Sequence, residues 1–437
     1  MDMELHQNWA LTGSDLNEFY EGLRYLTEHT RTTIVSSSMD LGIFAVVTSG
    51  DENDIVLAGF PNRANTGGRE LVTEDYERWA KSLIDANKRV GKLQLFGVQN
   101  AYTRFLPFDF EEEGMRGKIG DKAYEEMVEQ SKLLLSYNGR MYPVSPIAYT
   151  TLLARAALGG ESMTEPHYGR AVELARQLHH KRPTSLTLVT RENDTDGRVL
   201  VAAHSGKYAY LPQTVLIDMS TAIIDGLGEM KGESWHIDHT ISDCWAVFPE
   251  IADDISEAYP GLPEDVQAGL YIAASDTGNS SIIIRGFWKI GDHKVMGEEV
   301  KRSHRGDPDL DALVEATKET IFNKYLSLPD RLMELLAKDV ADPKKMVRAV
   351  FKETKIGRVI GRKRKEALMK AMDASFVAGA PYTAYDIAML FLSIPEHITG
   401  LSDMSQADIV TACSKAVFAK CLLSSKFAPA DDEEDIL

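Results

Sequence analysis

The chain has 437 residues, of which 44% are hydrophobic and 26% are charged, and its formal net charge is −18. This length exceeds what one compact core holds, and the composition is that of a globular protein, which excludes disordered and fibrous classes. Three cysteines without a CxxC pair exclude a disulfide framework, and no signal peptide or membrane-length apolar run is evident. We therefore expect a cytoplasmic protein of two or three domains.

The order of helix and strand signals predicts an α+β fold. We expect an antiparallel sheet with packed helices in the N-terminal and central parts, and an all-helical C-terminal part. The expected divisions are an α+β region at 1–182, a sheet-and-helix core at 183–306, a helical domain with a basic helix pair at 307–426, and a disordered acidic tail at 427–437.

Turn residues and apolar spacing place the elements of the first region. Ser14 is the expected cap of a helix at 15–29. Further strands are predicted at 32–36, 42–47, 54–60 and 92–98, helices at 73–90, 122–136, 146–157 and 166–181, and an exposed loop at 108–121.

Two hairpins mark the central region. The turn 192–197 joins strands at 185–191 and 198–205, and Asp276 to Asn279 joins two apolar runs within Gly269–Trp288. The second hairpin is apolar on nearly every position, which predicts the middle of a sheet with both faces covered. A helix at 213–227 and a strand pair at 234–240 and 244–248 complete one expected antiparallel sheet with a helix on one face.

Proline residues and acidic capping residues mark the expected starts of helices in the C-terminal region. Asp307-Pro308 and Asp342-Pro343 each place a capping acid before a proline at the first helical position. The predicted helices span 308–326, 329–339, 343–356, 362–377, 383–393 and 405–424.

Positive charge is concentrated in residues 344–370, which hold eleven Lys or Arg against two Glu. In the helix that begins near residue 344, helical spacing places the cations on one face and the apolar residues on another. The next helix begins with four consecutive cations, which are unfavourable beside the positive end of the helix dipole. Both features favour an anion-binding surface, and nucleic acid is the anion we expect. The alternatives are a solvated helix face and pairing with the protein's own acids. The candidate residues are Lys344, Lys345, Arg348, Lys352, Lys355, Arg358, Arg362, Lys363, Arg364 and Lys365.

The last seven residues, DDEEDIL, carry five acids and end in two apolar residues. This tail is similar to the acidic C-terminal tips of bacterial and phage single-strand-binding proteins. The resemblance implies a tail that docks on replication or repair proteins and competes with DNA; the alternative is a solubilising tail.

The sequence supports a catalytic function less well than nucleic-acid binding. Asp276-Thr277-Gly278 matches a short aspartic protease signature, but no second copy is present to share a proton. His236, Asp238 and His239 could hold a metal in a hydrolase or nuclease, although a strand points only two of them to one face. We expect no enzyme activity, no metal and no cofactor. Five aromatic residues are candidates for base stacking or for the core: Tyr208, Tyr210, Tyr271, Phe287 and Trp288.

Residues 207–305 resemble a phage- and plasmid-encoded family of unknown function, usually labelled phage/plasmid-like protein. The resemblance lies in the segment 207–212, in Ser275-Asp276-x-Gly278, and in the basic segment 301–305. Lys289 to His293 departs from the Cys-x-Asn-Gly that the family often carries. The family is distantly similar to phage annealing proteins, which implies a curved antiparallel sheet with helices and assembly into oligomers.

These observations predict a phage or mobile-element protein that binds single-stranded nucleic acid, as a homo-oligomer, in annealing or recombination. The alternative is a structural phage virion or assembly protein that forms a homo-oligomer and whose basic helices meet an acidic partner. The sequence does not separate DNA from RNA as the ligand.

Overall fold

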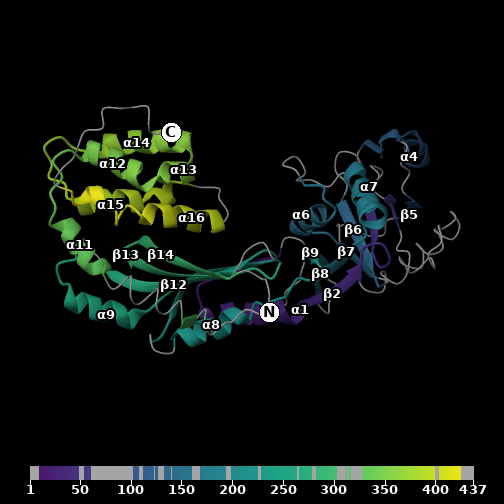
Figure 1. The fold of residues 1–437 in the computed structure, drawn as a ribbon, viewed down its shortest axis with the longest axis horizontal. Helices are drawn as coiled ribbons and strands as arrows, with labels where there is room; N and C mark the ends of the chain where they lie inside the picture. Colours follow the sequence, from purple (N-terminus) through teal and green to yellow (C-terminus); the bar gives the residue numbers. More distant parts are fainter. Residues whose placement is uncertain are drawn as a thin grey trace.

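The fold of the chain is described from a computed structural model (Figure 1). The described residues are 9–48, 54–60, 102–107, 112–122, 124–125, 132–138, 140–159, 168–192, 198–224, 228–262, 265–277, 282–302, 312, 314–315, 327–398 and 403–424. The class is α+β, with antiparallel sheets and C-terminal helices, which confirms the prediction. The predicted helix at 73–90, strand at 92–98 and tail at 427–437 lie outside the described residues, as does most of the predicted helix at 308–326.

A six-stranded antiparallel sheet forms the centre of the molecule, in the order β1-β10-β11-β12-β13-β14. The predicted hairpin is β12 and β13, and both strands lie inside the sheet, as its continuous apolar pattern predicts. The outer strand β14 was not predicted. The strands are β1 (Ala10–Gly13), β10 (Lys231–Asp238), β11 (Ser242–Val247), β12 (Val266–Ala274), β13 (Ile282–Ile290) and β14 (His293–Arg302).

Helices cover both faces of this sheet. Figure 1 shows α1 (Leu16–His29), α8 (Val215–Ile224) and α9 (Pro249–Ala258) below the sheet, and α15 (Ala384–Leu392) and α16 (Asp403–Ser414) above it. Residues of β12 and β13 enter two separate apolar clusters from opposite faces, so Ile272 packs in the main core while Tyr271 packs with Val410 of α16. Burial on both faces explains why the strands carry few polar residues.

Two smaller sheets form the other end of the molecule. A three-stranded sheet has the order β2-β8-β9, and a five-stranded sheet has the order β5-β4-β3-β6-β7. The helix α6 (Pro146–Arg155) packs on β9. The strands are β2 (Thr30–Ser36), β3 (Gly42–Thr48), β4 (Asp54–Phe60), β5 (Tyr102–Pro107), β6 (Lys132–Tyr137), β7 (Arg140–Pro143), β8 (Ser185–Glu192) and β9 (Arg198–Ser205).

Three predictions for this end of the chain are wrong in whole or in part. The loop expected at 108–121 contains the helix α4 (Glu112–Ile119). The helix expected at 122–136 is confirmed at its start, where 122 and 124–125 are helical, but its last residues belong to the strand β6. Leu133, Leu134 and Leu135 are all buried, so β6 is covered on both faces, and such an apolar run does not distinguish a helix from a covered strand. The cap of α1 is Asp15 rather than Ser14, since its carboxylate accepts from the Asn17 and Glu18 N–H groups.

Strand pairing differs from the single central sheet that the sequence predicts. β8 and β9 do not join β10–β14; β8 pairs instead with β2 over its whole length, and β1 pairs with β10. In the sequence, the segment that contains α8 lies between β8–β9 and β10–β14. The predicted boundary at residue 182 is therefore spanned by two strand pairs, because β1 and β2 lie before it and their partners β10 and β8 lie after it.

The helices after residue 327 follow the predicted order. Asp342 caps α12 by accepting from the Lys345 N–H at 3.0 Å, with Pro343 at the first helical position. Phe351 of α12 packs edge-on against Phe391 of α15, with ring centroids 4.8 Å apart. The helices are α11 (Leu328–Leu336), α12 (Pro343–Thr354), the unpredicted short α13 (Ile356–Ile360), α14 (Arg362–Ser375), α15 and α16. The described part of the chain contains no helix long and apolar enough to cross a membrane.

Candidate nucleic-acid interface

The helix α12 has one apolar face and one basic face. Met346, Val347, Val350 and Phe351 are buried in the main core. The cations lie on the opposite side, where helical spacing places them, and their side chains are exposed. They are Lys344, Lys345, Arg348, Lys352 and Lys355.

The chain turns sharply between α12 and α14 and keeps its cations at the surface. Lys355 ends α12 in the left-handed region with a φ of 57°, and Gly361 separates α13 from α14 with a φ of 85°. Arg358 is exposed on the short α13. A positive φ at Gly361 favours glycine, and this conformation sets the direction in which α14 begins.

The N-terminus of α14 has cations but no cap. Gly361 provides no side chain to accept from the first N–H groups of the helix. Arg362, Lys363 and Arg364 form the first turn, all three are exposed, and the turn holds no acid. Free N–H groups and the positive end of the helix dipole therefore lie beside three cationic side chains, an arrangement that favours an anionic ligand.

Few of these cations are paired. Arg348 Nη2 donates to Asp373 Oδ2 of α14 at 2.9 Å, Arg362 Nε donates to Glu366 Oε1 at 2.9 Å, and Lys345 lies 3.6 Å from Asp342. Over the described residues, no carboxylate pairs with the other exposed cations of the set. These are Lys344, Lys352, Lys355, Arg358, Lys363 and Arg364. Pairing with the protein's own acids therefore accounts for a minority of the set.

Lys365 differs from the other nine predicted residues because its side chain is half-buried. Its stem lies so close to Gly357 that an added Cβ there would be 2.6 Å from Lys365 Cδ, and its ammonium is 5.9 Å from the Phe351 ring centroid. Desolvation by burial lowers the pKa of Lys365. This side chain packs α14 against α12 and α13, and we leave it out of the candidate surface.

The five aromatic candidates are buried or half-buried. Tyr271, Phe287 and Trp288 are buried in the central sheet, because β12 and β13 are covered on both faces. Tyr208 stacks on His204 with ring centroids 3.9 Å apart and donates to the Asp276 carbonyl at 2.9 Å. Burial raises the pKa of both Tyr208 and Tyr210. Tyr271, Phe287 and Trp288 therefore belong to the core, as the alternative interpretation expected, whereas Tyr208 and Tyr210 are half-buried.

A buried polar cluster was not predicted. Arg191 of β8 is fully buried, and its Nη2 donates to Asp276 Oδ1 at 2.6 Å while its Nη1 donates to His239 Nδ1 at 2.8 Å. Gln213 Nε2 donates to the same Asp276 oxygen at 3.1 Å. The Asp276-Thr277-Gly278 motif drew attention to Asp276 in the sequence. Nothing in the sequence around Arg191 indicates that it pairs with Asp276.

The segment from His236 to His239 does not gather metal ligands. His236 Nε2 lies 3.1 Å from Asp238 Oδ2, whereas His239 turns away to meet Arg191. No group of three or more His, Cys, Asp or Glu side chains suited to a metal ion occurs among the described residues.

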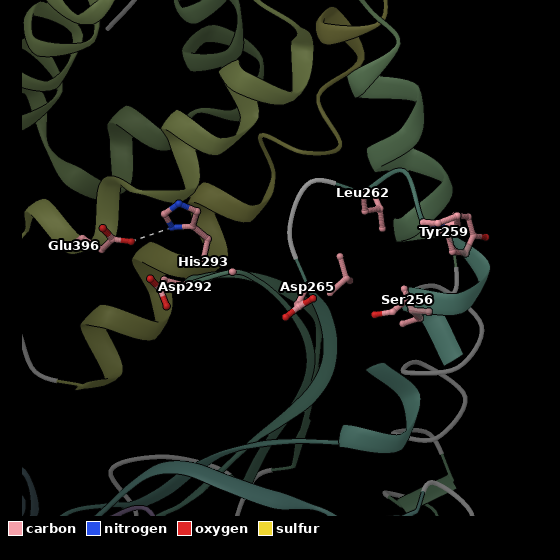
Figure 2. A pocket seen from close by; sticks show the side chains of 11 residues that line it. Ser256, Tyr259, Leu262, Asp265, Asp292, His293 and Glu396 are labelled. Atoms are coloured by element: carbon pink, nitrogen blue, oxygen red, sulfur yellow. Dashed lines mark ion pairs between the residues drawn. The ribbon is translucent and has the colours of Figure 1, made fainter. Parts of the chain in front are cut away.

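A pocket of about 680 Å³ lies at one end of the central sheet, between the end of α9 and the turn that joins β13 to β14 (Figure 2). Asp265, Asp292 and Glu396 give it an acidic lining, and His293 Nδ1 lies 2.9 Å from Glu396 Oε1. Among the described residues that line it, none is Lys or Arg. An acidic pocket repels phosphate, so it does not belong to the basic surface.

Comparisons of the chain with protein-family models, with curated proteins and with solved structures found no match.

Proposed function

We propose that this protein binds single-stranded nucleic acid through the phosphate backbone. The binding surface consists of the exposed cations of α12, α13 and the first turn of α14, and we call it the basic surface. Its residues are Lys344, Lys345, Arg348, Lys352, Lys355, Arg358, Arg362, Lys363 and Arg364.

The start of α14 is the observation that supports this proposal most. A fourteen-residue helix begins with three exposed cations and no side-chain cap. A structural helix gains stability from an acid or a capping residue at this place, so the observed residues cost stability in the absence of an anion. A phosphate group satisfies the free N–H groups and the three cations together.

The stripe on α12 extends this anion site into a longer track. Lys352 and Lys355 lie at the end of α12 that leads through α13 to Arg362, so the exposed cations follow one another along the chain. A row of cations spread over three short elements suits several phosphates of one strand better than one compact anion.

Binding of this kind depends on charge and not on base identity. Since three of the predicted aromatic residues are buried and Tyr208 and Tyr210 are half-buried, we expect little preference among sequences of equal length and strong sensitivity to salt. Annealing of complementary strands is the activity we propose to follow from backbone binding, because a strand held by its phosphates keeps its bases free to pair.

The test compares two triple variants that remove the same charge. Arg362→Ala, Lys363→Ala and Arg364→Ala together remove the cations at the start of α14. The matched control removes three exposed cations elsewhere, Arg182, Lys207 and Lys231, by substitution with alanine. In fluorescence anisotropy with a labelled single-stranded oligonucleotide, the first variant should bind at least tenfold more weakly than wild type and the control should bind within about threefold of it. Equal losses in both variants would contradict a localised site.

A further inference from the structure

The strand β2 is the outer strand of the three-stranded sheet. It pairs with β8 from Thr30 opposite Arg191 to Ser36 opposite Ser185, and no described strand pairs with its other edge. Figure 1 shows β2 at the margin of this sheet, with β8 on its inner side. An open strand edge presents unpaired N–H and C=O groups that can bind another strand.

Hydrogen bonds at the end of β2 show which residues face outward. The Ser37 N–H donates to the Thr184 carbonyl at 2.9 Å, so the odd-numbered residues of β2 bind β8. The Ser36 N–H donates to Asp40 Oδ2 at 2.7 Å, and the Ser36 carbonyl accepts from the Asp40 N–H at 2.9 Å. Because strand pairing alternates, Thr30, Thr32 and Ile34 also direct their backbone groups away from β8.

The ends of this edge are satisfied within the chain. The Thr30 N–H donates to the Thr27 carbonyl, and the Thr30 carbonyl accepts from Arg31 Nη1 at 3.0 Å. Asp40 binds the outward groups of Ser36. Among the described residues, no group binds the N–H and C=O of Thr32 and of Ile34, two outward residues separated by Thr33, and these form the open part of the edge.

Within its own sequence and register, β2 has none of the usual protection against pairing. Natural edge strands are shielded by proline, lysine, a bulge or a covering segment. β2 contains no proline or lysine, its pairing with β8 has no bulge, and Arg31 is its single charged residue. The Ile34 side chain, at the centre of the open part, is 66% exposed.

We propose that β2 binds β2 of a second copy of this chain, in antiparallel orientation, about a two-fold axis at Thr33. In this register Thr32 of each chain lies opposite Ile34 of the other and exchanges both backbone hydrogen bonds with it. All four open groups of each edge are then satisfied. The two sheets join into one six-stranded sheet across a closed dimer, because a two-fold interface is self-complementary.

The side chains fit this pairing. Ile34 lies beside Thr32 of the second copy, and Arg31 lies opposite Val35 rather than opposite another Arg31, so no like charges face each other directly. A second copy fits because the open part is self-complementary in antiparallel orientation, where each N–H and C=O of Thr32 and Ile34 has its partner on the other copy. The proposal does not depend on nucleic-acid binding.

The first test is the molar mass of the protein in solution, measured by light scattering over a range of concentrations. Wild type should reach twice the chain mass of 48.5 kDa. Thr32→Pro should be monomeric with an unchanged circular dichroism spectrum, because proline removes only an N–H that faces outward. Ile34→Lys should also be monomeric, whereas Val377→Lys, at a position that is likewise 66% exposed, should remain a dimer. A monomeric wild type, or a dimer that both β2 variants leave intact, would overturn the proposal.

A cross-link tests the position of the axis. Two Thr33 residues facing each other form a pair without mutual hydrogen bonds, with Cα atoms about 4.5 Å apart, which lies within the range of a disulfide. The Thr33→Cys variant should therefore form a covalent dimer under mild oxidation, and the Val377→Cys variant should not. Failure of the Thr33→Cys variant to cross-link while it is dimeric by mass would overturn the assignment of β2 as the interface.

Discussion

Arg191 and Asp276 form an ion pair in which neither side chain is exposed, with Arg191 Nη2 2.6 Å from Asp276 Oδ1. Arg191 belongs to β8 of the three-stranded sheet, and Asp276 follows β12 of the six-stranded sheet. The pair therefore links two sheets that share no strand. Gln213 donates a hydrogen bond to Asp276, and His239 accepts one from Arg191. Four separate segments of the chain therefore meet at this ion pair.

Removal of one partner should destabilise the protein strongly. Asp276→Ala leaves the guanidinium of Arg191 buried without its counter-charge, and breaking such a pair costs about 3–5 kcal/mol. Urea unfolding followed by tryptophan fluorescence should show this loss, whereas Asp253→Ala at an exposed position of α9 should change the transition by less than about 0.5 kcal/mol. The double variant Arg191→Met, Asp276→Leu should recover part of the loss. Equal stability of Asp276→Ala and wild type would show that the pair does not hold the sheets together.

Asp238 should make the turn between β10 and β11 sensitive to acid. Burial raises the pKa of Asp238, but hydrogen bonds from His236, Thr240 and Ile241 outweigh burial and lower this pKa to about 2. Because the folded-state pKa is below the unfolded value of about 3.9, the stabilisation is complete above that value and is lost as pH falls toward 2.

The comparison of wild type with Asp238→Asn measures this contribution. The difference in unfolding free energy should be roughly 2 kcal/mol at pH 6 and should shrink between about pH 4 and pH 2. Thermal unfolding at several pH values checks it. A difference that stays constant over this range would mean that the carboxylate of Asp238 does not stabilise the fold through its charge.

Gly361 should be required for the geometry of the basic surface. Its φ of 85° is strained for any residue with a Cβ, and no atom lies within 4 Å of an added Cβ, so the cost of Gly361→Ala is conformational. We expect a loss of about 1–3 kcal/mol and weaker oligonucleotide binding, because the direction in which α14 begins would change. The control Gly117→Ala has equal space in α4 and no positive φ, so it should not lower stability. Unchanged binding by a folded Gly361→Ala would separate this turn from the site.

The acidic tail should compete with nucleic acid for the basic surface. Lys420 and Cys421 N–H groups donate to the Glu353 carboxylate of α12 at 2.7 and 2.9 Å, so the last described residues lie beside the basic helix. The thirteen residues that follow Ser424 can span about 45 Å when extended. Truncation after Phe427 should therefore strengthen oligonucleotide binding several-fold at low salt.

A second variant of the tail distinguishes the effect of its charge from the effect of its length. Replacement of the five acids at 431–435 by their amides should strengthen binding as much as truncation does, because the chain length is kept and the charge is lost. If neither change alters the dissociation constant, the tail acts elsewhere.

Local patterns predicted elements whose signals are short-range. The β12–β13 hairpin has turn residues between two apolar runs, and α12 has Asp342-Pro343 at its start and an amphipathic pattern along its length. The hairpin of β6 and β7 could have been found as well, because Asn138-Gly139 is a strong turn signal and Asn138 has a φ of 49°. It was missed because the apolar run before it also suits a helix.

Relationships between distant residues could not be predicted in this way. The pairing of β2 with β8 joins residues more than 140 positions apart, and nothing in either strand specifies the other. Arg191 likewise looks like any polar strand residue until Asp276 is placed beside it. In the candidate site, the exposed stripe of α12 follows from helical spacing, but the burial of Lys365 depends on how α14 packs against Gly357 and Phe351.

The salt dependence of oligonucleotide binding by the wild-type protein tests the central claim most directly. If the basic surface neutralises about five to eight phosphates, log affinity should fall with log salt concentration with a slope of roughly −3.5 to −6. Fluorescence anisotropy with single strands of equal length and different sequence should give similar slopes. No detectable binding at low salt, or affinity that does not change with salt, would contradict the account.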